Sequence, residues 1–218
     1  MSNKHCITPS ILNSFLYMQG IKDPEKKAAE EIKFLGQLRK EKFPSNPALD
    51  KGNEFEALIE KVTQGQKIED LVVKQFPEDE FKRETLNSVI NSIAAIVRGG
   101  TWQERVKSTL TLKQGGDSYL LYGRVDNMKP SIIYDIKYTG RKQLNKFSSS
   151  TQHRLYMECT GIQKFSYLIS DGKDWWREDY NRSVHDKEFL ETIINEMRTW
   201  IAKNEEADKA FNTKWLAF

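Results

Sequence analysis

The chain has 218 residues and a formal net charge of +3, from 34 lysines and arginines against 31 acidic residues. Hydrophobic residues make up 38% of it and aromatic residues 11%, which is enough for a packed core and excludes an intrinsically disordered chain. No apolar run approaches the roughly 18 residues of a membrane span, and the first residues lack the apolar centre of an export signal. Cys6 and Cys159 alone cannot form a disulfide framework or a structural zinc cluster. We therefore expect a cytoplasmic protein without a membrane partner.

The N-terminal part of the chain is predicted to be helical. Residues 8–18 are typical of a helix, because Thr8 can cap it and Pro9 suits the first helical position. The next helix carries Ile32, Leu35 and Leu38 at helical spacing. The predicted helices of this part span residues 8–18, 25–40, 50–62 and 78–98.

After residue 100 the hydrophobic pattern changes from helical spacing to alternation. The predicted strands span residues 103–113, 118–127, 131–138, 164–170 and 174–180, and the predicted helices span residues 145–159 and 186–206. This order predicts an α/β (α+β) fold, with a central mixed sheet of about five strands flanked by helices. We expect a single domain over 1–218, made of a helical part (1–49), a core (50–182) and a C-terminal helix and tail (183–218).

Asp135 and Lys137 interrupt the otherwise apolar strand at 131–138. They are two residues apart, so both side chains project from the same face of the sheet. A buried carboxylate beside a buried ammonium is costly unless the two are paired or bound to a metal. The alternative is an edge strand with an exposed charged pair.

Asp126 ends the preceding strand and can lie next to Asp135 across a short hairpin. Two adjacent carboxylates repel each other unless a cation lies between them, and oxygen ligands suit Mg²⁺ or Mn²⁺. Glu56, on the helix at 50–62, could supply a third carboxylate. Its alternative is an ordinary surface charge on a helix.

Basic residues are in excess in the middle of the chain. Between Arg98 and Lys146 there are ten lysines and arginines against four acidic residues. This distribution fits a polyanionic partner, and equally a solvated surface of mixed charge.

Four short motifs follow one another in the sequence: Gly52-x-x-x-Glu56, Gly123-x-x-Asp126, Asp135-Ile136-Lys137 and Gln152-x-x-x-Tyr156. Together they resemble the RecB-like branch of the PD-(D/E)xK nuclease superfamily, over residues 50–160. The segment 8–18 resembles the opening helix of that branch. Iron–sulfur members have a cysteine where Met18 stands here, so no cluster is expected and the chain is most similar to the cluster-free, phage-type exonucleases.

The resemblance implies a restriction-endonuclease-like core that hydrolyses DNA with one or two Mg²⁺ or Mn²⁺ ions. By this resemblance, Lys137 would orient or deprotonate the attacking water, and Gln152 and Tyr156 would position the DNA backbone or Lys137. The implied metal ligands are Glu56, Asp126, Asp135 and the backbone carbonyl of Ile136. The residues that could contact phosphates, and so make binding salt-sensitive, are Arg124, Arg141, Lys142 and Lys146.

The favoured function is an exonuclease that acts at DNA ends in recombination, repair or phage replication. Two alternatives remain: an endonuclease of the same superfamily, and a catalytically silent DNA-binding module on the same fold. The expected partner is DNA, with a second copy of the chain or a recombination or replication protein as a further possibility. The resemblance places the protein in the cytoplasm of a bacterial or phage-infected cell.

Overall fold

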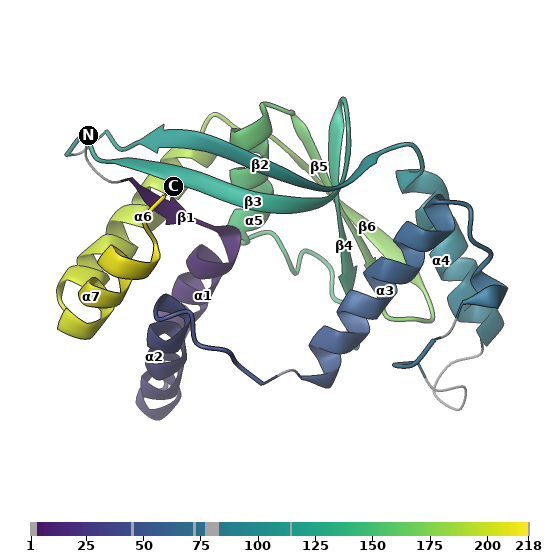
Figure 1. Ribbon diagram of the computed structural model, residues 1–218, viewed down its shortest axis with the longest axis horizontal. Coiled ribbons are helices and arrows are strands. Elements are labelled where there is room, and N and C mark those ends of the chain that lie inside the picture. The colour runs from purple at the N-terminus through teal and green to yellow at the C-terminus, as the bar shows by residue number, and fades with distance from the viewer. Residues whose placement is uncertain (1–3, 45, 72, 77–82, 114, 218) are drawn as a thin grey trace.

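A mixed six-stranded sheet forms the centre of the computed structural model, which describes residues 4–44, 46–71, 73–76, 83–113 and 115–217 (Figure 1). The strands are β1 (His5–Ile7), β2 (Thr101–Thr111), β3 (Ser118–Lys129), β4 (Ile132–Tyr138), β5 (Lys164–Ser170) and β6 (Trp175–Asn181). They are ordered β1-β3-β4-β5-β6, with β2 also paired to β3. The β1–β3 and β4–β5 pairs are parallel and the others antiparallel. The predicted mixed sheet is confirmed, and β1 is a strand that the sequence did not predict.

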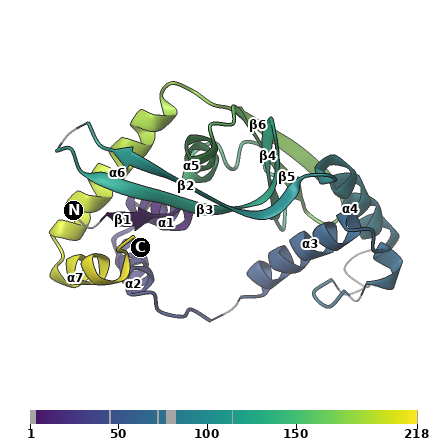
Figure 2. The same cartoon turned by 45° about the horizontal axis from the view of Figure 1, so that its top comes forward.

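Helices cover both faces of this sheet. They are α1 (Pro9–Gly20), α2 (Pro24–Leu38), α3 (Pro47–Thr63), α4 (Arg83–Val97), α5 (Thr151–Thr160), α6 (Asp186–Ala202) and α7 (Glu205–Lys214), with a short 3₁₀ turn, η1 (Ile68–Asp70). One core joins β-strand residues to α1, α2, α5, α6 and α7, and a second joins them to α3 and α4. Figures 1 and 2 show α3 and α4 beside β4–β6, with α1, α2, α6 and α7 towards the other end of the molecule. None of the helices in the described ranges is long and apolar enough to cross a bilayer.

Several helix boundaries differ from the prediction because polar side chains cap the helices. The third helix begins at Pro47 and not at residue 50, since Asn46 accepts the N–H of Leu49. The predicted helix at 145–159 begins only at Thr151, where Ser150 is the cap. The predicted helix at 186–206 is two helices, because Asn204 accepts the N–H of Ala207 and starts α7.

Two further expectations concern α2 and α4. In α2, Leu38 is buried, in agreement with the helical spacing, and Phe34 is buried as well. Ile32, which the same spacing included, is 68% exposed. In the predicted helix at 78–98, residues 77–82 lie outside the described part, and the structure gives the helix from Arg83.

The β3–β4 ladder is short. It pairs Asn127 with Tyr134 and ends there, although the next positions in the same register are Asp126 and Asp135. On its other edge β4 continues to pair with β5 along its whole length from Ile133. The sheet is therefore open on one side of β4, at the two aspartates.

Candidate active site

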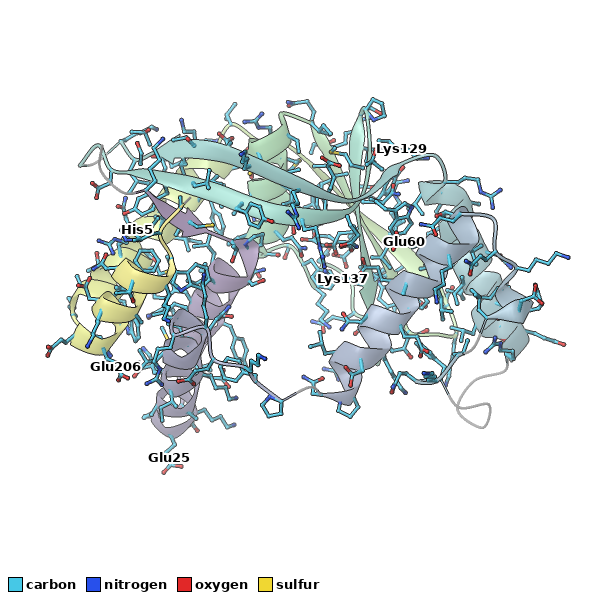
Figure 3. The ribbon with its side chains drawn as sticks, in the orientation of Figure 1. His5, Glu25, Glu60, Lys129, Lys137 and Glu206 are labelled. Atoms are coloured by element: carbon cyan, nitrogen blue, oxygen red, sulfur yellow. The ribbon has the colours of Figure 1, made fainter. Side chains whose placement is uncertain are left out.

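Asp126, Asp135 and Lys137 meet where β3 and β4 separate. The side chain of Asp135 is fully buried, and its Oδ2 lies 2.6 Å from the Nζ of Lys137. The N–H of Ile136, at the point where the β3–β4 ladder has ended, donates to Oδ2 of Asp126 at 2.8 Å. Figure 3 shows Lys137 near the middle of the molecule, between α1 and α3. The predicted Asp–Asp–Lys grouping is thus a partly buried cluster.

The cluster is electrostatically strained. Burial, followed by the charge of Asp135, raises the pKa of Asp126 well above its ordinary value. Burial also raises the pKa of Asp135, although the ammonium of Lys137 partly offsets it. Burial opposes the charged form of Lys137, but the carboxylates of Asp135 and Asp126 outweigh it and raise its pKa. In the absence of a bound cation, the lysine is therefore protonated and partly neutralises the two acids.

The face of α5 that carries Gln152 and Tyr156 supports this cluster. Gln152 donates from Nε2 to Oδ1 of Asp135 at 2.6 Å, and the hydroxyl of Tyr156 donates to the backbone carbonyl of Arg124 at 2.8 Å. A Cβ on Gly123 would lie only 2.2 Å from the ring of Tyr156, so this position has to be glycine for the ring to pack on β3. The close packing gives the glycine of the Gly123-x-x-Asp126 motif a physical reason.

Glu56 approaches the cluster from α3, on the other side of the sheet from α5. Burial, followed by the charge of Asp135, raises the pKa of Glu56. Gln103 of β2 donates its side-chain N–H to Oε1 of Glu56. Gln103 was not predicted from the sequence, where a glutamine in an alternating strand gives no functional signal. Gly52, in contrast, has open space where a Cβ would lie, so packing does not explain why this position is a glycine.

The donor set is chemically suited to a hard divalent cation, since it consists of the carboxylates of Glu56, Asp126 and Asp135. The acids are not arranged as a complete metal site in this structure. Among the described residues, no three or more histidine, cysteine or acidic side chains form a group that could hold a metal ion. Lys137 and Gln152 engage Asp135, and Gln103 engages Glu56.

Three of the four predicted phosphate contacts lie in the exposed segment between β4 and α5. Lys142 is 3.2 Å from Asp174, and Lys146 donates to the hydroxyl of Thr139 at 3.1 Å, while Arg141 is exposed. The Lys142 pair is solvent-exposed on both sides, and such pairs are worth about 1 kcal/mol or less, so a phosphate could displace it. Arg124, the fourth, is exposed on β3, and its positive charge acts on Glu56.

Comparison with known proteins yields matches among solved structures alone: no protein family and no curated protein matches the sequence. The crystal structure of SSO0001 is 12% identical, with a TM-score of 0.53, and the match covers 92% of this chain and 78% of that one. An alkaline exonuclease (LHK-Exo) from Laribacter hongkongensis is 12% identical, with a TM-score of 0.44 and coverage of 90% and 92%. The same enzyme in complex with dAMP is 13% identical, with a TM-score of 0.41 and the same coverage.

The chain shares the arrangement of helices and strands of SSO0001. The mixed sheet flanked by helices that the sequence predicted is therefore confirmed, and the resemblance to the phage-type exonucleases of the PD-(D/E)xK superfamily rests on the sequence motifs. At 12% identity, the likeness concerns the arrangement of helices and strands and leaves the chemistry to be argued from the side chains.

Proposed function

We propose that this chain is a divalent-metal-dependent deoxyribonuclease that acts at DNA ends. The observation that carries the proposal is the meeting of Asp126 and Asp135 at the end of the β3–β4 ladder, with Lys137 2.6 Å from one of them. Two repelling, buried carboxylates destabilise the protein unless they serve a bound cation. Apolar side chains at these two positions would give a more stable protein.

Asp126, Asp135 and Glu56, with the backbone carbonyl of Ile136, would hold the cation. A divalent ion supplies a bound water of lowered pKa and offsets the charge that develops on the phosphate.

Lys137 would act as a donor towards the phosphate or the attacking water. The position of the Lys137 ammonium, 2.6 Å from Asp135 within the cluster, supports this role. Gln152 would keep Asp135 oriented, and Tyr156 would hold β3 against α5 through its bond to the carbonyl of Arg124. Arg141, Lys142 and Lys146 would attract the DNA backbone.

The preference for DNA ends rests on the resemblance of the Gln152-x-x-x-Tyr156 motif to the exonuclease branch. The same acids and lysine would also serve an endonuclease. The direction of digestion, the preference for one or two strands, and a role in recombination, repair or phage replication are parts of the proposal that the cleavage products would define.

The test is cleavage of end-labelled linear DNA and of covalently closed circular DNA, with Mg²⁺, Mn²⁺ or EDTA. Wild-type protein should degrade the linear form in the presence of metal alone. Lys137→Ala should lower the rate at least about 100-fold, since a positioned proton donor contributes about that much or more. Lys187→Ala, at an exposed lysine of α6, is the matched control and should cut like wild type.

Cutting of the circle would replace the exonuclease by an endonuclease. DNA binding without any cutting, unaffected by metal, would favour the catalytically silent module. Equal activity of Lys137→Ala and wild type would refute the assigned site.

A further inference from the structure

Gln103 has an unusual backbone conformation for a residue inside a strand. Its φ is +54°, in the left-handed region that favours glycine. Lys40 and Asn145 are the other non-glycine residues of the described ranges with positive φ, and both lie in turns. This conformation is unfavourable for an L-residue, so the surrounding structure must hold it in place.

The position of Gln103 in the ladder places it beside the acidic cluster. Its neighbours Trp102 and Glu104 pair with Asn127 and Val125 of β3, so Gln103 stands opposite Asp126. The left-handed conformation departs from the extended backbone that makes side chains alternate along a strand. The side chain reaches Glu56, which is 47 residues away in the sequence on α3.

The side-chain amide of Gln103 is engaged on one side only. Its N–H group donates to Glu56, while its carbonyl oxygen is buried and has no hydrogen-bond partner. An unpaired buried acceptor destabilises a protein, because it has lost its hydrogen bonds to water without replacing them. Both the strained backbone and the unpaired oxygen are therefore features that packing alone does not justify.

We propose that Gln103 is a positioning residue that fixes the carboxylate of Glu56 for the cation proposed above; this inference rests on the proposed function. Without the amide, the carboxylate of Glu56 would lose the hydrogen bond that fixes its orientation. Gln152 of α5 fixes the carboxylate of Asp135 in the same way, by donating to its Oδ1. Two of the three acids are thus each held by a glutamine amide, and each amide comes from a different element.

The test measures Mn²⁺ affinity by titration calorimetry or electron paramagnetic resonance, together with kcat and KM on linear DNA. Gln103→Met keeps the length of the side chain and removes the amide. It should raise the Mn²⁺ dissociation constant about 10-fold, as changes behind a metal ligand do, and lower kcat without changing KM. Gln103→Gly, which adopts a positive φ without strain, should give the same loss and shows that a failure to fold is not the cause.

Two comparisons separate positioning from a general structural effect. Gln163→Met, at an exposed glutamine whose amide bonds the carbonyl of Gly161, should leave both quantities unchanged. In a Glu56→Ala background, Gln103→Met should have no further effect on Mn²⁺ affinity, because its only route to the cation is Glu56.

An equal loss from Gln103→Met with and without Glu56 would overturn the inference, as would a wild-type Mn²⁺ affinity in Gln103→Met and Gln103→Gly. In both of these outcomes the wild-type protein still binds Mn²⁺ and cuts DNA, so the proposed function stands. Failure of the wild-type protein to bind Mn²⁺ would remove the proposed function and this inference together.

Discussion

Asp126 and Asp135 hold facing positions in the β3–β4 register, and the ladder ends just before them. The two carboxylates cannot share that position as ordinary ladder neighbours, since like charges opposite each other destabilise a sheet. The structure resolves this by opening the sheet and giving the freed N–H of Ile136 to Asp126. The local loss of pairing therefore leaves both acids outside the β3–β4 ladder.

The raised pKa of Asp126 makes the stability of the metal-free protein depend on pH. Because the folded state holds this proton more tightly than the unfolded chain, with its ordinary value of 3.8, stability falls as pH rises through the raised pKa. We expect the melting temperature to be higher at about pH 5 than at about pH 8. Asp126→Asn should raise the melting temperature at the higher pH and reduce this difference, while abolishing cleavage.

Thermal unfolding in EDTA, followed by circular dichroism, measures this effect. Asp70→Asn, at an exposed acid of η1, is the control and should retain the pH dependence of wild type. A lower melting temperature for Asp126→Asn than for wild type at the higher pH would contradict the account of repulsion.

At the scale of elements, α1 fixes the beginning of α5. Asn13 of α1 accepts the backbone N–H of Thr151 at 2.8 Å and donates to the hydroxyl of Ser150 at 3.2 Å. It therefore acts as a cap from another helix, one residue before Gln152. The orientation of the glutamine that contacts Asp135 thus depends on the packing of α1 against α5.

Asn13→Ala should lower the free energy of unfolding by about 1 kcal/mol, the typical value of a helix cap. The matched control is Asn91→Ala on the exposed face of α4, where alanine should be neutral or slightly stabilising. Urea unfolding of the three proteins measures both differences. An effect of Asn13→Ala equal to that of Asn91→Ala would show that this contact does not stabilise α5.

The elements that the sequence predicted well are those whose pattern is local. Alternation is enough to locate β2 and a short apolar run is enough to locate β4, and the hairpin of β3 and β4 brings Asp126 towards Asp135. Prediction failed where a single side chain decides a boundary: the hydroxyl of Ser150 sets the start of α5, and the amide of Asn204 divides α6 from α7. Gln103 was missed because its role depends on a backbone conformation that no residue pattern encodes.

At the scale of the whole molecule, β1 and the C-terminal segment close the fold together. The N–H of Cys6 donates to the carbonyl of Trp215, and the N–H of Ala217 donates to the carbonyl of Lys4. The ring of Trp215 is buried, and its N–H donates to the carbonyl of Leu38 at 2.8 Å. The described part of the C-terminal tail therefore packs against the body of the chain.

Trp215→Ala should lower the free energy of unfolding by about 3–5 kcal/mol, because it empties a buried site of this size. Tyr17→Ala, at an aromatic side chain that is 65% exposed, should change it by about 0.5 kcal/mol or less. Guanidinium unfolding measures both. A loss below about 1 kcal/mol for Trp215→Ala would indicate that the tail detaches without disturbing the core.

The contact between Trp215 and Leu38 joins residues that are 177 positions apart. During translation, every side chain assigned to the site has left the ribosome before this tryptophan is made. The nascent chain can therefore form β3, β4 and α5 before Trp215 is available to bond β1 and Leu38, and that contact closes a long loop. We expect the segment around β1 to stay exposed to chaperones and proteases for longer than β3, β4 and α5 in the newly made protein.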